Sequence, residues 1–72
     1  MYALKTSSPA PNFPNRLFLV RSAFGWSVGS RPTTKFSTVK EAENAKEYLA
    51  RPNPYVDDVF TATYRNCEIV KL

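Results

Sequence analysis

The amino-acid sequence predicts a small α+β domain, with an antiparallel sheet of three to five strands and one helix packed on one face. Several short runs alternate between apolar and polar residues, which is the period of a strand with one buried side. Residues 39–50 instead repeat their apolar positions at helical spacing. The chain has 72 residues, of which 43% are hydrophobic. This suits a single domain over residues 1–72, with two or three strands before the helix and one or two after it.

The first elements are a short strand over residues 2–6 and a proline-rich loop over residues 7–15. Proline fixes φ and removes a backbone donor, so the loop, with Pro9, Pro11 and Pro14, cannot be a ladder strand or a helix interior. Phe13 is the large apolar residue of this loop. We expect it to pack back onto the domain, and the alternative is an exposed contact for a partner.

A hairpin follows. Residues 17–21 are mostly apolar and favour a strand, so we expect a central strand there, and residues 22–25 form a turn in which Gly25 is free to adopt positive φ. Residues 26–30 alternate, with Trp26 and Val28 on one side of the strand. After an interruption at Arg31-Pro32-Thr33, residues 34–36 resume as a short strand or sheet edge.

The helix over residues 39–50 has signals at both ends. Thr38 fits the N-cap position, and Glu41 lies three residues later, which is the spacing of a capping box. Arg51 precedes Pro52, and a residue before proline is disfavoured in helical conformation. The apolar positions that we expect to face the sheet are Val39, Ala42, Ala45, Tyr48 and Leu49.

A second proline-rich loop is predicted over residues 51–58, and two strands after it. Residues 59–65 alternate, with Phe60, Ala62 and Tyr64 on one side. Asn66 marks a turn or bulge, and residues 67–72 form the last strand. A terminal strand must pair to be ordered, and residues 2–6 are a candidate partner. Because an exposed edge promotes association, we expect a monomer or an edge-strand dimer.

Composition argues against catalysis. The chain has no histidine, the commonest general base, and a single cysteine, so no cofactor, metal site or enzymatic activity is expected. We interpret Cys67 as a half-buried strand residue in a cytoplasmic protein, since small secreted domains usually carry several disulfides. The adjacent acids Asp57 and Asp58 are interpreted as solvated residues of a loop or turn, and the alternative is a cation site or an acid–base pair. No apolar run approaches the roughly 20 residues that span a bilayer.

Charge divides the chain into two parts. Residues 1–40 hold six bases and no acid, for +6, and residues 41–72 hold four bases and six acids, for −2, which together give the net +4. The predicted contact residues are Arg16, Arg21, Arg31 and Lys35, with Phe13 and Tyr55 as aromatic anchors. Basic residues interleaved with aromatics can bind nucleic acid. The alternative is ordinary solubilising charge with Trp26 in the core.

One part of the sequence resembles the arm-site DNA-binding domain of tyrosine-type phage integrases. The resemblance covers residues 17–50 and rests on Trp26 followed by Thr34-Lys35-Phe36-Ser37-Thr38-Val39-Lys40-Glu41-Ala42-Glu43. It implies a three-stranded sheet followed by a helix, with a basic sheet face that inserts into the DNA major groove through Arg21, Arg31 and Lys35. The chain departs from that pattern in its proline-rich loop and in the strands after the helix.

The whole length is similar to small accessory proteins of tailed phages. Tyr2-Ala3-Leu4-Lys5, the central Trp26, Phe36-Ser37 with Glu41-Ala42, and Glu68-Ile69-Val70 carry this resemblance. It implies a non-enzymatic modulator that binds a host protein or protein–nucleic-acid complex, such as RNA polymerase, a nuclease or a CRISPR effector, often to inhibit it. Direct DNA binding through a basic sheet face is the alternative function.

Overall fold

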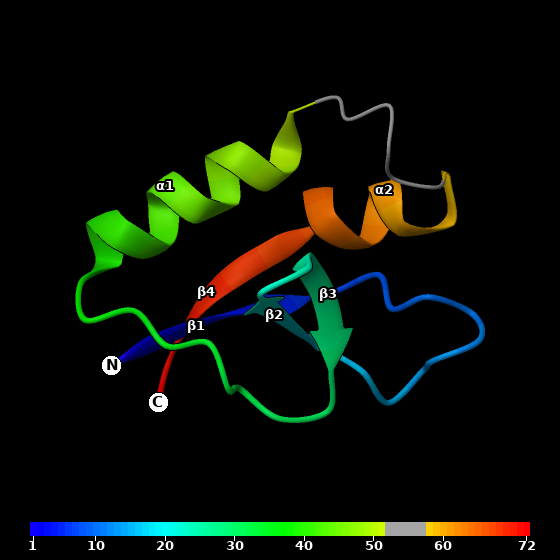
Figure 1. Cartoon of the computed structure of the whole chain (residues 1–72), viewed down its shortest axis with the longest axis horizontal. Helices are drawn as coiled ribbons and strands as arrows, with labels where there is room; N and C mark the ends of the chain where they lie inside the picture. Colours follow the sequence, from blue (N-terminus) through cyan, green and yellow to red (C-terminus); the bar gives the residue numbers. More distant parts are fainter. Residues whose placement is uncertain (52–57) are drawn as a thin grey trace.

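The computed structural model describes residues 1–51 and 58–72, in which one antiparallel sheet is covered on one side by two helices (Figure 1). The connection from residue 30 to residue 38 leads from the end of the last hairpin strand to the start of the first helix. The two termini lie close together, and the Leu72 amide donates to the Met1 carbonyl at 2.8 Å. The predicted α+β class is therefore confirmed.

The sheet has four strands in the order β3-β2-β1-β4, and every neighbouring pair is antiparallel. The last strand pairs with the first along its whole length, from Tyr2 opposite Lys71 to Thr6 opposite Cys67, which confirms the partner suggested by the sequence. The two edges of the sheet are β3 and β4. The strands are β1 (Tyr2–Thr6), β2 (Phe18–Ser22), β3 (Gly25–Gly29) and β4 (Cys67–Lys71).

The strands β1 and β2 pair at one end and diverge at the other. They are in register only at Lys5 and Phe18, and the segment of residues 34–36 lies in the space between them. There Phe36 forms a two-bond bridge with Tyr2 of β1, and the Thr34 hydroxyl accepts a 2.7 Å hydrogen bond from the backbone N–H of Arg21 in β2. The predicted short strand is thus a single bridge that fills a gap in the sheet.

Helix α1 (Val39–Ala50) has the predicted bounds and the predicted cap. The Thr38 hydroxyl accepts a hydrogen bond from the Glu41 backbone N–H at 3.2 Å. The Glu41 carboxylate does not return to Thr38 but accepts from the backbone N–H and the hydroxyl of Ser37, at 3.2 and 3.0 Å. The capping box is therefore displaced by one residue, and it fixes the junction between residues 34–36 and the helix.

The strand predicted over residues 59–65 is wrong, because this segment forms helix α2 (Asp58–Arg65). Valine, threonine and aromatic residues favour strands only weakly, and tertiary context overrides that preference. Only Asn66 separates the segment from β4, and a one-residue connection is too short for the hairpins that usually join antiparallel strands. Burial also follows a helical pattern, since Thr63 and Tyr64 are both buried and Ala62 is exposed.

Hydrogen bonds from side chains and backbone attach α2 and the following Asn66 to the end of β1 and the residues after it. The buried Thr6 hydroxyl donates to the Thr63 carbonyl at 2.7 Å, and the Thr63 hydroxyl donates to the Ser8 carbonyl at 2.7 Å. The Asn66 carbonyl accepts from the backbone N–H of Ser7 at 2.8 Å. These bonds set the angle at which α2 lies across the sheet.

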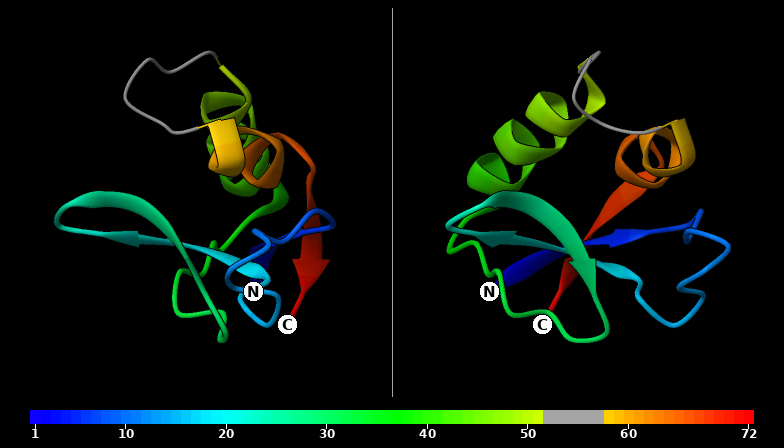
Figure 2. Two further views of the ribbon diagram at one scale, coloured as in Figure 1. Left: turned by 90° about the vertical axis from the view of Figure 1, so that its right-hand side faces the viewer. Right: turned by 45° about the vertical axis from the view of Figure 1, so that its right-hand side comes forward.

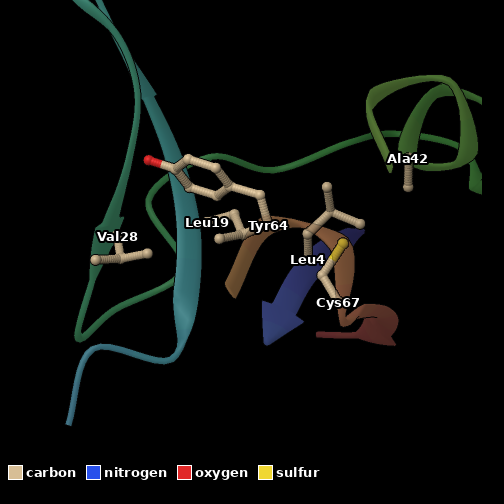
Figure 3. Packing of buried hydrophobic residues seen from close by; sticks show 6 residues of the cluster. All are labelled: Leu4, Leu19, Val28, Ala42, Tyr64 and Cys67. Carbon is tan, nitrogen blue, oxygen red and sulfur yellow. The ribbon is translucent and has the colours of Figure 1, made fainter. Parts of the chain in front are cut away.

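The core lies between the sheet and the helices (Figure 3). Its buried members come from all four strands and from both helices: Leu4, Leu19, Val28, Ala42, Tyr64 and Cys67. In Figure 3, Leu4 and Cys67 lie together, and the Tyr64 ring extends toward the β2–β3 hairpin. Because Ala42 is small and fully buried, α1 approaches the sheet closely at that point.

Candidate functional site

A groove of about 770 Å³ lies between α1 and the β2–β3 hairpin. Its volume falls within the range of roughly 300–1,000 Å³ that is typical of ligand clefts. Figure 2 shows, in its left view, the hairpin projecting away from the helices. The hairpin wall consists of Arg21, Gly25 and Trp26, the α1 wall of Glu41, Asn44, Ala45 and Tyr48, and the floor of residues 34–36.

The hairpin wall contains a cation beside an aromatic ring. Arg21 and Trp26 are register partners in the ladder, and directly opposed residues lie on the same face of a sheet. That face carries Leu19 and Val28 in the core, so the predicted parity of Trp26 with Val28 is confirmed. Trp26 packs against the core, as one interpretation of the sequence had it, and part of the same residue also lines the groove beside Arg21.

The groove floor is held by hydrogen bonds on both sides of Lys35. Its preceding residue, Thr34, is bonded to β2 through Arg21, and its following residue, Phe36, is bridged to Tyr2 of β1. The backbone of Lys35 is thereby fixed between two strands while its side chain remains exposed. This arrangement brings a second predicted contact residue into the same groove as Arg21.

Tyr48 was expected to face the sheet, and that prediction is wrong. Successive residues of a helix point about 100° apart, and the adjacent Leu49 packs against the core. Tyr48 is 59% exposed and lines the groove. The apolar stripe that packs inward is narrower than the sequence suggested and consists of Ala42, Ala45 and Leu49. Val39 was also expected to face the sheet, but it is 41% exposed and lies outside the core cluster.

Among residues 1–51 and 58–72, the charges that line the groove are two cations and one carboxylate. Arg21 and Lys35 lie on the hairpin wall and the floor, and Glu41 lies on the α1 wall. The Glu41 carboxylate already accepts two hydrogen bonds from Ser37, which partly satisfy its negative charge. Trp26, Phe36 and Tyr48 line the same groove, so its lining combines three aromatic residues with a net positive charge.

The remaining predicted contact residues are not part of this groove. Phe13 is 37% exposed and lies outside the core cluster, and the Arg16 guanidinium sits over its ring at 4.4 Å from the centroid. The hairpin ladder ends at Phe18 and Gly29, so Arg16 and Arg31 lie beyond the end that is opposite the turn. The loop predicted over residues 51–58 lies outside the described residues except at Arg51 and Asp58, as does the predicted anchor Tyr55.

The sheet face that turns away from the helices has little positive charge. Alternation along the strands places Lys5, Phe18, Val20 and Glu68 on that face. Lys5 is the register partner of Glu68, so its charge is opposed by a neighbouring carboxylate. Arg21 belongs to the other face with Trp26. The described strands therefore do not form the basic outer face that the integrase resemblance implies.

The described residues contain no group of three or more side chains suited to hold a metal ion. Cys67 is buried, and burial raises the pKa of its thiol, an effect that the positive charge of Lys46 partly opposes. Burial also raises the pKa of Tyr64. Neither described helix is long and apolar enough to cross a membrane.

Comparison of the chain with protein-family models, curated proteins and solved structures finds no match.

Proposed function

We propose that this protein is a non-catalytic binding module that holds an acidic segment of a partner protein in the groove between α1 and the hairpin. The observation that carries the proposal is the presence of Arg21 and Lys35 in one groove with three aromatic side chains, Trp26, Phe36 and Tyr48. Arginine and aromatic residues are enriched among the residues that dominate binding energy at protein interfaces. The phage resemblance makes this partner a host protein or protein–nucleic-acid complex in the cytoplasm.

Two observations support a protein rather than a nucleic acid as the occupant. Nucleic-acid affinity grows with the number of phosphates that cations neutralise, and the described residues that line the groove include only two cations and also a carboxylate, Glu41. The sheet face that turns away from the helices combines Lys5 with Glu68, and Arg21, on which the DNA-binding alternative relies, lies on the other face. Direct DNA binding is therefore the alternative that the test below can reveal.

Absence of catalysis is part of the proposal and is supported by chemistry. The chain contains no histidine, and its one thiol is buried, with a raised pKa that disfavours the reactive thiolate. A groove lined by aromatic and charged side chains is sufficient to bind a partner without a reacting group.

The test is position-specific photo-cross-linking in bacterial lysate. A photoreactive p-benzoylphenylalanine replaces Tyr48 in the groove wall, and in a matched control it replaces Glu68, which is exposed on β4. We expect an adduct from position 48 alone that protease removes, that nuclease leaves intact, and that disappears with Arg21→Ala and Lys35→Ala together. Equal adducts at both positions, or an adduct that nuclease removes, would contradict the proposal.

A further inference from the structure

We infer that the groove recognises a short extended peptide in which one large apolar side chain is flanked by acidic residues. The inference rests on the proposed function and specifies the chemistry of the bound segment. It follows from three features of the groove: its aromatic lining, the fixed backbones of its two basic residues, and the length of its helical wall.

The interior of the groove suits one apolar side chain. Trp26, Phe36 and Ala45 are half-buried and pack against the core, so their positions are fixed while part of each surface stays open to the groove. Tyr48 adds an exposed ring from the facing wall. A ligand side chain placed among these groups removes apolar surface from water on both partners, which is the main favourable contribution to such binding.

The backbones of the two basic residues are held in place before any ligand binds. The Arg21 backbone is bonded on one side to Thr34 and lies in the β2–β3 ladder on the other. Lys35 stands between Thr34 and Phe36, each of which is bonded to a different strand. Fixed backbones reduce the ordering cost of binding. Acidic groups on the ligand fit these cations, whereas a basic ligand would be repelled.

The helical wall limits the length of the recognised stretch. Glu41 and Tyr48 are the outermost α1 residues of the groove, and the seven steps between them cover about 10 Å at a rise of ~1.5 Å per residue. An extended peptide covers this distance with about three residues at ~3.3 Å each. About three residues of a peptide therefore contact the groove, and we assign them to one apolar residue and its two acidic neighbours.

Trp26 is the only tryptophan of the chain and lines the groove, so its fluorescence reports occupancy directly. The probe is acetyl-Ser-Glu-Leu-Glu-Ser-amide, and two counterparts replace either Leu by Gly or both Glu by Gln. We expect the Leu-to-Gly peptide to bind about tenfold more weakly or worse, because burial of leucine is lost. The Gln peptide should bind severalfold more weakly, and this difference should shrink at high salt.

Variants of the protein separate groove binding from general charge attraction. Arg21→Ala and Lys35→Ala should each weaken binding of the acidic probe, whereas Arg31→Ala removes an exposed base outside the groove and should leave it unchanged. Glu41→Gln should strengthen it, because a carboxylate that repels the ligand is removed from the wall. Tyr48→Ala should weaken all three peptides with little effect on folding, since the side chain is mostly exposed.

The outcomes distinguish the inference from the proposed function. Equal affinity for the three peptides, or no change in Trp26 fluorescence with any of them, overturns the inference. The proposed function then stands if the position-48 protein adduct forms, and it fails as well if that adduct is absent. An oligothymidylate serves as the competing probe. If it binds more tightly than the acidic peptide, as measured by Trp26 fluorescence, both the inference and the proposed function are overturned in favour of nucleic acid.

Discussion

The Tyr64 hydroxyl donates a hydrogen bond of 3.1 Å to the main-chain carbonyl of Trp26, which connects α2 to the hairpin wall of the groove. The Arg21 N–H points to Thr34 rather than to β3, so Arg21 and Trp26 form a pair that is not hydrogen-bonded to each other. In such a pair the Trp26 carbonyl points away from β2, toward the free edge. Tyr64 therefore satisfies an acceptor that the edge strand leaves without a ladder partner.

Replacing Tyr64 with phenylalanine keeps the ring in the core and removes this hydrogen bond. We expect Tyr64→Phe to lower the free energy of unfolding by about 1 kcal/mol, measured by urea denaturation. The Trp26 emission should also change, because the hairpin wall loses its attachment to α2. Tyr48→Phe is the matched control, since that ring is mostly exposed, and its effect should stay within about 0.5 kcal/mol. Equal effects of the two variants would contradict the prediction.

Stability should fall at alkaline pH. Burial raises the pKa of Tyr64 above its ordinary 10.0 and that of Cys67 above its ordinary 9.0. The unfolded chain therefore loses these protons first, and stability that is complete below the ordinary values is lost as pH rises through the raised ones. Urea denaturation from about pH 8 to about pH 11 should show a shallower decline in Tyr64→Phe and Cys67→Ala than in the unchanged protein. Parallel pH profiles would refute this origin.

Local signals explain which elements were predictable. The bounds of α1 follow from Thr38 at one end and Arg51-Pro52 at the other, both of which act within a single turn of helix. Helix α2 was not predictable in the same way, because Val59 to Tyr64 favour a strand when considered alone. Its helical form depends on the short connection to β4 and on bonds from Thr63 to the distant Thr6 and Ser8.

The site was predictable only in part. Charge identified Arg21 and Lys35, and alternation placed Trp26 on the face of the sheet that the core uses. The groove itself exists because residues 34–36 enter the space between β1 and β2, and no local pattern shows that insertion. For the same reason Tyr48 was expected in the core, since its exposure depends on where the hairpin stands relative to α1.

The N-cap of α1 should contribute measurably to stability. Thr38→Ala removes the hydroxyl that accepts from the Glu41 backbone N–H, and loss of such a cap costs about 1 kcal/mol. The midpoint of thermal unfolding, followed by circular dichroism, should therefore be lower in this variant. Thr33→Ala is the control, since Thr33 is exposed and its side chain makes no hydrogen bond to the described residues. A midpoint unchanged in Thr38→Ala would refute the role of the cap.

The turn of the hairpin depends on Gly25, which has a φ of +113°. An added Cβ at this position meets no atom within 4 Å, so the cost of Gly25→Ala comes from backbone conformation alone. We expect a loss of about 1 kcal/mol in urea denaturation. In the control Gly29→Ala, φ is ordinary and the new Cβ lies 3.4 Å from the Val20 side chain. A larger loss in Gly29→Ala than in Gly25→Ala would show that packing, not the turn conformation, limits the hairpin.

The threonines that join β1 to α2 should act as a coupled pair. Thr6 is buried, and its hydroxyl donates to the Thr63 carbonyl and accepts from the Ser8 N–H at 3.1 Å. Thr6→Val keeps the shape but leaves both partner groups without this hydroxyl, including the carbonyl of the buried Thr63, which should cost about 1–3 kcal/mol. Thr6→Ser restores the hydroxyl and should recover most of that loss.

Thr63→Val removes the bond to the Ser8 carbonyl, so Thr6→Val and Thr63→Val release the same stretch of chain from α2. In a double-mutant cycle by urea denaturation, we expect a coupling free energy of at least about 0.5 kcal/mol. Additive losses would show that the two hydroxyls stabilise the protein independently.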